Sequence, residues 1–179
     1  TPNNPTGMMY TSDELAEIAA ICRKNRVLVL SDEIYSPLTF NGLQHHSIAK
    51  WYPEGTIILN GLSKWGGAGG WRLGFFIFPS QLRWLQDSMA IIASETFSSC
   101  SAPIQYAACA AFEGYYGSEI QNYLKVSRDV LNVLANKSYD TLSQIEGCYV
   151  KKSNGAFYTF PDFTDVPGLR SLCRDSDNF

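Results

Sequence analysis

The chain has 179 residues, of which 45% are hydrophobic and 17% are charged, and this balance is typical of a globular domain with a substantial core. Its formal net charge is −3 and its charges are scattered, so we expect no basic surface for nucleic acid or for an anionic membrane. No apolar run approaches the roughly 20 residues of a membrane-spanning helix, and the first residues lack a secretory signal pattern.

The cysteines and the two ends of the chain give further bounds. Five cysteines are present, widely spaced and without a Cys-x-x-Cys pair or a metal-ligand spacing. We therefore expect reduced thiols in an intracellular, cytoplasmic protein. Because the sequence starts at Thr1 without methionine and ends on a polar segment, we interpret it as an internal fragment of a longer chain.

The first predicted elements are a helix and a strand. Thr11 and Glu14 form a capping-box pattern, and an apolar helical face follows them: Leu15, Ile18, Ala19 and Cys22. Residues 26–35 are then a continuous apolar run of strand length, which predicts a strand buried on both faces of a parallel sheet. Residues 55–62 and 71–79 repeat this pattern and predict two further strands.

Three helices are predicted after Pro79. The apolar face of the first consists of Leu82, Leu85, Met89 and Ile92. Residues 101–114 form the second. The third is a long amphipathic helix near residues 118–142, with a buried side made of Ile120, Leu124, Leu131 and Leu134.

The segment after the long helix has a different pattern. Residues 147–163 resemble two short strands around the turn Ser153-Asn154-Gly155. We therefore predict that residues 1–146, including the long helix, are part of a large domain, and that residues 147–179 begin a smaller C-terminal domain.

Polar residues gather where the predicted strands end. In open α/β sheets, ligands bind outside the carboxyl ends of the strands. Asp32, Glu33 and Tyr35 end the first strand, Lys64 follows the second, and the turn over residues 3–7 precedes the first helix. Each feature alone has an ordinary explanation, namely a solvated loop, a surface lysine and a simple turn. Their joint occurrence favours a functional site.

Arg72 is informative because it lies in an apolar stretch. A buried guanidinium is costly without a matching anion, so we expect Arg72 to be buried beside an anion such as phosphate. The planar guanidinium can bind two phosphate oxygens at once. The glycines before it do not form a nucleotide loop, because Arg72 stands where the dinucleotide fingerprint needs glycine and Gly67 where a P-loop needs lysine. We infer that they let the backbone pass close to a bound group.

Four segments, taken together and in this order, resemble a known family: NNPTG, SDEIY, LSK and GWRLGF. They are similar to motifs of the fold type I enzymes that use pyridoxal phosphate, and within these to the class I/II aminotransferases. The spacing of eight residues between Lys64 and Arg72 is specific, and the resemblance extends from Thr1 to about Asp162. It implies an α/β fold, the central part of a three-layer, cofactor-binding large domain with a mostly parallel sheet, followed by the beginning of a smaller α+β domain.

The resemblance also implies residue roles. Lys64 matches the lysine that forms the Schiff base with the cofactor and then moves the substrate's proton. Asp32 matches the carboxylate that pairs with the pyridine nitrogen and so lets the ring accept electrons. Tyr35 and Asn4 match the groups that hydrogen-bond the phenolic oxygen of the ring, and Arg72 matches the residue that holds the phosphate.

This sequence departs from the family pattern at one position. Many relatives carry serine or threonine three residues before the lysine as a phosphate ligand, whereas this chain has Gly61. Ser63 is a further candidate cofactor-binding residue, but it lies at another place on the backbone and cannot simply substitute. Either a backbone amide or another side chain completes the phosphate site, or phosphate binding is weaker.

Other expected parts of such a site have no match in this chain. In the family, the loop that caps the phosphate and the aromatic ring that stacks on the cofactor precede the Asn-Pro-Thr-Gly turn. The arginine that binds the substrate carboxylate follows the last residue matched here. We therefore expect the isolated fragment to be inactive.

The predicted function is a pyridoxal-phosphate-dependent aminotransferase that acts on an amino acid and a 2-oxo acid and is a homodimer in its full-length form. The same residues serve carbon–sulfur lyases and synthases of the aminocyclopropane-carboxylate type, and a regulator that keeps the fold as a ligand sensor is a third alternative. The substrate is not specified. No metal site is expected, because His45 and His46 are interpreted as surface residues without a third ligand at a suitable spacing.

Overall fold

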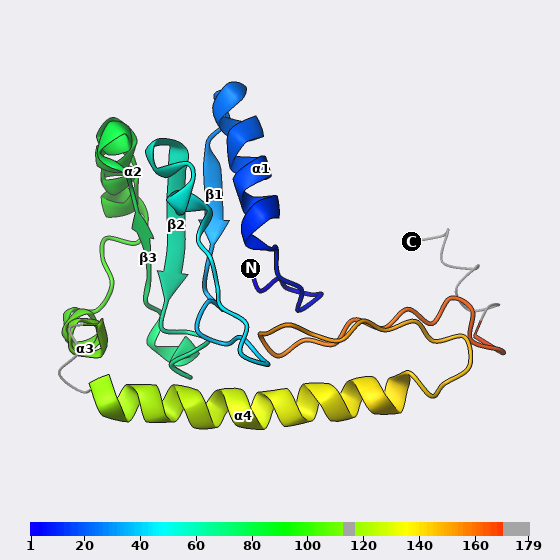
Figure 1. Cartoon of the computed structure of the whole chain (residues 1–179). Coiled ribbons are helices and arrows are strands. Elements are labelled where there is room, and N and C mark those ends of the chain that lie inside the picture. The colour runs from blue at the N-terminus through cyan, green and yellow to red at the C-terminus, as the bar shows by residue number, and fades with distance from the viewer. Residues whose placement is uncertain (113–116, 170–179) are drawn as a thin grey trace.

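The computed structural model describes residues 1–112 and 117–169. In these residues a three-stranded sheet is flanked by helices, and the arrangement is part of an α/β domain, as predicted (Figure 1). The strands are β1 (Val29–Asp32), β2 (Thr56–Gly61) and β3 (Gly74–Ile77), in the order β1-β2-β3. All three lie within the ranges that the apolar runs predict.

The sheet is mixed. β1 and β2 are parallel, with Val29 opposite Thr56, whereas β2 and β3 are antiparallel, with Gly61 opposite Gly74. The carboxyl ends of β1 and β2 therefore meet at the same edge as the first residue of β3. The segments after β1, after β2 and before β3 come together there.

The helix before β1 is confirmed with its cap. α1 spans Ser12–Lys24, the Thr11 hydroxyl accepts a hydrogen bond from the Glu14 amide (3.2 Å), and the Glu14 carboxylate accepts one from the Thr11 amide (2.7 Å). This capping box satisfies two amide donors at the start of the helix. The buried residues Leu15 and Ala19 pack toward Val29 and cover one face of β1.

The expected burial of β1 on both faces is wrong in this chain. Val29 packs in the α1 cluster, but the side chain of Leu30 is 66% exposed. Successive side chains of a strand point to opposite faces, so Leu30 lies on the face that α1 does not cover. The apolar pattern predicts the strand correctly but not the cover on its second face.

Three helices follow β3, as predicted: α2 (Arg83–Thr96), α3 (Ala102–Phe112) and α4 (Gly117–Leu142). Their expected buried faces are only partly correct. Leu124 is buried, whereas Ile92 is 63% and Leu134 is 55% exposed. Residues 113 and 114, predicted as the end of the second helix, lie outside the described residues. None of the helices within residues 1–112 and 117–169 has the length and apolar character needed to cross a membrane.

The main hydrophobic core lies at the carboxyl ends of β1 and β2, and we call it the site-end core. Its buried members come from the segments that follow β1 and β2, from the residue before β3, from α3 and α4, and from the C-terminal segment. They are Tyr35, Leu38, Leu62, Trp65, Leu73, Ala108, Leu124 and Ala156. Parts of the chain that are far apart in sequence are thus packed around one end of the sheet.

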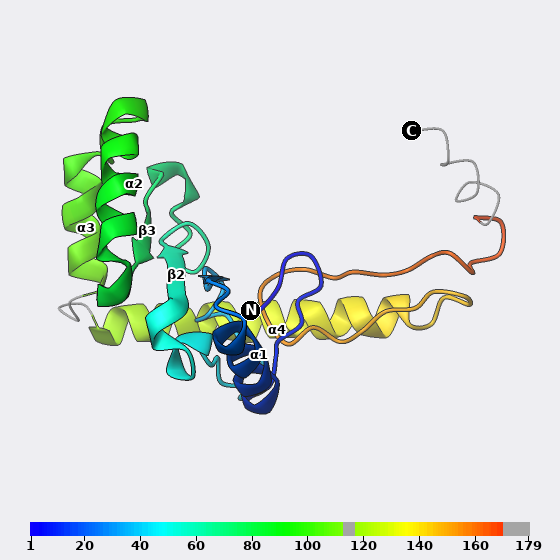
Figure 2. The same ribbon diagram turned by 90° about the horizontal axis from the view of Figure 1, so that it is seen from above.

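The C-terminal segment runs back along α4 toward this core (Figures 1 and 2). The Lys152 ammonium lies 5.7 Å from the centre of the Tyr139 ring of α4. The two predicted strands are not formed within residues 147–169, where the antiparallel arms are bridged at Tyr149 and Asp162. Gly155 of the expected turn instead pairs with Thr39. The division at residue 147 stays a prediction, and its last residues, 170–179, lie outside the described ranges.

Candidate active site

A polar cavity of about 420 Å³ opens at the carboxyl ends of β1 and β2. Four of the six predicted site residues line it, namely Asp32, Ser63, Lys64 and Arg72. The structure therefore brings a carboxylate, a hydroxyl, an amine and a guanidinium to one place. The two other predicted residues, Asn4 and Tyr35, do not line this cavity but lie next to it, as their contacts show.

Asp32 is the last residue of β1, and its carboxylate is exposed. One carboxylate oxygen accepts a hydrogen bond from the Ile34 amide (3.1 Å). A short polar side chain that binds the backbone two residues later fixes a turn, so the strand ends here and the carboxylate stays in place. Asp32 can therefore act as an anion of fixed position at the cavity.

The neighbouring carboxylate has a different environment. Glu33 is buried and accepts hydrogen bonds from the hydroxyls of Ser31 (3.0 Å) and Ser47 (2.5 Å). His45 Nε2 lies 3.8 Å from the Glu33 carboxylate, and burial lowers the pKa of His45 although Glu33 opposes this. The prediction that His45 is a surface residue is wrong, because its side chain is only 15% exposed. The described residues contain no group of three metal-ligating side chains.

Tyr35 is buried, and its hydroxyl shares a hydrogen bond with the hydroxyl of Tyr158. Burial raises the pKa of Tyr35 above its usual range, and Tyr158 and the Asp32 carboxylate raise it further. A hydrogen bond with the Asn4 side chain acts in the opposite direction. Tyr35 therefore stays a neutral phenol with one proton to donate, and the Asn4 side chain lies at its hydroxyl.

Lys64 follows β2 and is exposed to the cavity. Its ammonium lies 5.9 Å from the centre of the Tyr35 ring and 5.9 Å from the centre of the Phe157 ring. The faces of aromatic rings attract a cation weakly within about 6 Å. Two rings thus restrict where the Lys64 amine lies, while no carboxylate forms an ion pair with it among the described residues.

Arg72 lies between the short 3₁₀ turn Gly69–Trp71 and β3, and it adopts a left-handed backbone conformation with a φ of 56°. Its guanidinium donates a hydrogen bond to the Gly69 carbonyl (2.8 Å). The expectation that Arg72 is buried is wrong, because its side chain is exposed at the cavity. The remaining donors of the guanidinium are therefore available to an anion that enters the cavity.

Gly61 has a steric explanation. A Cβ atom at this position would lie 2.6 Å from the Leu73 carbonyl oxygen and 3.0 Å from the Gly74 Cα, which is too close for any side chain. These atoms belong to the backbone of the paired segment that leads into β3. The close pairing of β2 and β3 therefore excludes a serine or threonine three residues before Lys64.

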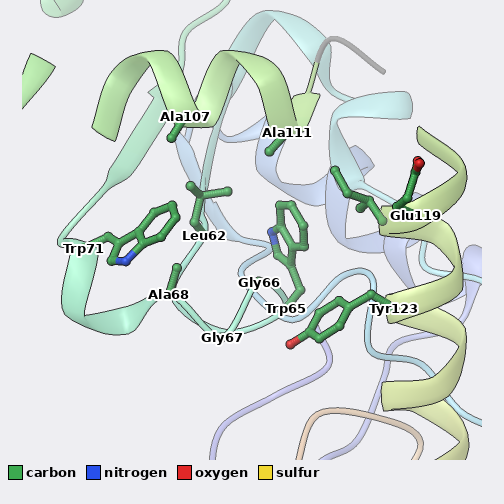
Figure 3. A pocket seen from close by; sticks show the side chains of 11 residues that line it. Leu62, Trp65, Gly66, Gly67, Ala68, Trp71, Ala107, Ala111, Glu119 and Tyr123 are labelled. Carbon is green, nitrogen blue, oxygen red and sulfur yellow. The ribbon is translucent and has the colours of Figure 1, made fainter. Parts of the chain in front are cut away.

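A second cavity, of about 430 Å³, lies on the loop that follows β2 and is apolar (Figure 3). Leu62, Trp65 and Trp71 point into it, and Ala107 and Ala111 of α3 face them, with Tyr123 and Glu119 of α4 at its side. The loop that carries Lys64 thus separates a polar cavity from an apolar one. Of these two cavities, the polar one gathers groups suited to acid–base or anion chemistry.

Two residues near Lys64 are missing from the sequence-based prediction. The rings of Phe157 and Tyr158 each make an edge contact with the Tyr35 ring, at centroid distances of 5.4 and 5.5 Å. They are brought there by backbone pairing, because the Ala156 amide donates to the Leu38 carbonyl (2.8 Å). The run of aromatic residues after Gly155 is a visible signal, but nothing in the sequence indicates its partner 123 residues earlier.

Comparison with known families and proteins gives a consistent result. The family model described as "Aminotransferase class I and II" matches residues 1–175. The aspartate aminotransferase of Geobacillus stearothermophilus is 38% identical over 182 residues, which cover 100% of this chain and 44% of that protein. The asparagine–oxo-acid transaminase of Streptococcus mutans is 34% identical over 90% of this chain and 40% of that protein.

Solved structures agree with these sequence matches. The aromatic aminotransferase of Pyrococcus horikoshii superposes with a TM-score of 0.82 at 32% identity, over 90% of this chain and 42% of that one. The alanine aminotransferase of Pyrococcus furiosus superposes with a TM-score of 0.80 at 33% identity, over 93% of this chain and 42% of that one. The chain spans less than half the length of these relatives.

Proposed function

The chain belongs to the class I and II aminotransferase family, and on that basis we propose that the whole protein is a pyridoxal-phosphate-dependent aminotransferase. It moves an amino group between an amino acid and a 2-oxo acid, as the names of its relatives describe for those proteins. The observation that supports this proposal most is the polar cavity in which Asp32, Lys64 and Arg72 meet. The amino-acid substrate stays unassigned.

The side chains of the cavity fit the cofactor. Pyridoxal phosphate carries an aldehyde, a basic ring nitrogen and a phosphate, and the cavity offers an amine, a carboxylate and a guanidinium. When bound, the cofactor supplies an aldehyde that bonds to an amine and a ring that accepts electrons from the substrate's α carbon. The site needs no metal ion in this proposal.

Lys64 has two roles. Its amine would be the group that bonds to the aldehyde of the cofactor, and this amine lies 5.9 Å from the ring centres of both Tyr35 and Phe157. With cofactor and substrate bound, the neutral Lys64 amine would serve as the general base for the proton on the substrate's α carbon.

Asp32 and Tyr35 adjust the charge of the bound ring. The Asp32 carboxylate would pair with the ring nitrogen of the bound cofactor and favour the protonated form of that nitrogen. Burial raises the pKa of Tyr35, so its neutral hydroxyl, together with the Asn4 amide, would donate hydrogen bonds to the phenolic oxygen of the bound cofactor.

Arg72 binds the phosphate through the donors that Gly69 does not use. Because no side chain fits at position 61, we propose that Ser63 and backbone amides of the loop after β2 complete the phosphate contacts. Without a hydroxyl at position 61, phosphate affinity depends more strongly on Arg72.

We propose further features of the whole protein. It is a homodimer, a proposal supported by the many exposed apolar side chains of this chain. Residues 1–146 belong to the cofactor-binding domain, and residues 147–179 begin the small domain. An intracellular location is supported by the free thiols of the four cysteines in the described part of the chain.

A labelling experiment tests the attachment site. The whole protein is saturated with pyridoxal phosphate, treated with borohydride and digested, and the modified peptide is identified by mass spectrometry. We expect the cofactor on Lys64, and no specific label in Lys64→Ala. A label on Lys50 or Lys125, both of which also occur in this chain, would show that the assignment is wrong. Formation of glutamate from 2-oxoglutarate then indicates transfer, whereas release of pyruvate and ammonia indicates a lyase.

A further inference from the structure

The Tyr35 hydroxyl has a partner whose role the family resemblance does not supply. Tyr158 lies 123 residues later and shares a hydrogen bond with Tyr35, and the two rings meet edge to face at a centroid distance of 5.5 Å. A buried hydroxyl that binds another hydroxyl is a matched donor and acceptor pair. The direction of this hydrogen bond decides what Tyr35 can offer to a ligand.

The backbone fixes the positions of both tyrosines. The Leu38 amide donates to the Tyr35 carbonyl (2.8 Å), and the Ala156 amide donates to the Leu38 carbonyl (2.8 Å). Ala156 is fully buried, and a Cβ at Gly155 would lie 2.4 Å from the Leu38 carbonyl oxygen. The segment that carries Tyr158 is therefore pressed against the turn that carries Tyr35, and the two hydroxyls meet because of this packing.

The bonding capacity of the Tyr35 hydroxyl limits the possibilities. A phenol has one proton to donate and two lone pairs to accept hydrogen bonds. The Asn4 side chain, a hydrogen-bond partner that lowers the pKa of Tyr35, uses one lone pair. If Tyr35 donated to Tyr158, its proton would be used. If Tyr158 donates to Tyr35, the Tyr35 proton stays available for a ligand at Lys64.

An anionic ligand oxygen favours the second direction. In a chain of hydrogen bonds each donor polarises the next, so a hydroxyl that accepts a bond donates more strongly. The charged and titratable groups that face Tyr35 are the Asp32 carboxylate, the Lys64 ammonium and the Tyr158 hydroxyl. Of these, only Tyr158 can donate to the Tyr35 oxygen through a bond present in the structure.

We propose that Tyr158 is a positioning residue: it donates its proton to the Tyr35 oxygen and thereby directs the Tyr35 proton to the anionic oxygen of a ligand held at Lys64. This inference rests on the proposed function, because the ligand is the cofactor and the anionic oxygen is the phenolic oxygen of its ring. It adds a residue from the C-terminal segment to the group that sets the proton affinity of the Lys64 linkage.

The test is a pH titration of the absorbance of the Lys64-bound cofactor in the whole protein. Loss of the donor in Tyr158→Phe weakens the stabilisation of the phenolic oxygen, so the midpoint of the titration should rise by about 0.5–1 pH unit. Tyr149→Phe is the matched control, since Tyr149 lies in the same segment and is 62% exposed. It should leave the midpoint unchanged.

A second arm shows whether the effect passes through Tyr35. In a Tyr35→Phe background, Tyr158→Phe should no longer shift the midpoint, because the acceptor is gone. In the cofactor-free protein, the losses in melting temperature from Tyr35→Phe and Tyr158→Phe should be less than additive. Because this measurement needs no cofactor, it also tests the contact between Tyr35 and Tyr158 in a variant that binds cofactor poorly.

The outcomes separate the two proposals. If the unmodified protein attaches cofactor at Lys64 but Tyr158→Phe leaves the midpoint unchanged, the role of Tyr158 is refuted and the proposed function stands. The same holds if the shift is equally large in the Tyr35→Phe background. If the unmodified protein forms no Lys64-bound cofactor, both proposals are refuted.

Discussion

The two ends of this molecule differ in how completely they are packed. In the site-end core, Leu38 is 2% exposed and Ala156 is fully buried, and both belong to loops that hold candidate catalytic groups. In α2, which lies beyond β3, no residue is buried, and Trp84 and Ile91 are 64% and 67% exposed (Figure 1). This chain therefore packs the loops that support its site but leaves α2 without a buried residue.

The largest expected effect concerns this chain alone. We expect residues 1–179 in isolation to catalyse no transamination, because the phosphate-capping loop, the stacking ring and the carboxylate-binding arginine of the family have no match in them. We also expect the uncovered apolar faces to cause self-association, measurable by sedimentation velocity.

The assay of the isolated chain uses saturating cofactor, an amino donor and 2-oxoglutarate, and it compares glutamate formation with that of the Lys64→Ala chain. Glutamate formed only when Lys64 is present would show that the site is complete within this chain. Such a result would overturn our view that the site-end core supports the active site without completing it.

At the well-packed end, the next largest effect is expected for Asp32→Asn in the whole protein. The amide keeps the shape but removes the charge, so turnover should fall by roughly 10²-fold or more while part of the cofactor is retained. Steady-state kinetics measure this change. Asp129→Asn, on the exposed side of α4 and paired with Lys125, is the control. If Asp32→Asn turned over nearly as fast as the control variant, the proposal that Asp32 helps the cofactor ring to accept electrons would be wrong.

Two Leu→Ala substitutions, one at a buried and one at an exposed position, compare the packing of the site-end core with that of α4. In the isolated chain of residues 1–179, Leu38→Ala should lower the free energy of unfolding by about 2–5 kcal/mol, because it leaves a cavity in a packed core. Leu134→Ala, at a residue that is 55% exposed, should change it by about 0.5 kcal/mol or less. Urea denaturation measures both. Equal losses would mean that α4 is covered as fully as the core.

The smallest effect is expected at the surface ion pair between Arg23 of α1 and Glu54, which are joined by two hydrogen bonds of 2.6 and 3.0 Å. The Arg23 guanidinium lowers the pKa of Glu54 from 4.5 to about 2. A lowered carboxyl pKa stabilises the folded state above the unfolded value, and this stabilisation is lost as the pH falls from 4.5 toward 2. Glu54→Gln should therefore lower the melting temperature slightly at neutral pH.

Two conditions check the ion-pair explanation. The difference between Glu54→Gln and the unmodified protein should shrink at high salt, since exposed charges are screened, and it should disappear once the pH falls below about 2. A difference that persists in both conditions would show that packing of the Glu54 side chain, and not its charge, is responsible.

The sequence predicts local structure well because local causes determine it. The capping box of Thr11 and Glu14 defines the start of α1, and the apolar runs define the three strands. The meeting of Asp32 and Lys64 is also predictable, because parallel strands bring their carboxyl ends to one edge.

Features that depend on distant partners could not be predicted. The contact of Tyr35 with Tyr158 and that of Glu33 with His45 need the tertiary packing of loops, which no periodicity encodes. The exposure of Arg72 was mispredicted because an apolar sequence neighbourhood does not guarantee a buried spatial one. The exposure of Leu30 has the same origin, since an apolar strand does not reveal which elements cover it.

Hydrogen bonds between the first residues of the chain and the segment around residue 154 have a consequence for folding during synthesis. The Gly7 carbonyl accepts hydrogen bonds from the amides of Asn154 (2.9 Å) and Gly155 (3.2 Å), and the Ser153 hydroxyl contacts it across 146 residues of sequence. At the usual rate of translation, the ribosome needs roughly 7–30 s to pass from one of these positions to the other. During that interval Tyr35 has no Tyr158 to bind. The three strands can therefore pair in the nascent chain before the hydrogen bond between Tyr35 and Tyr158 can form.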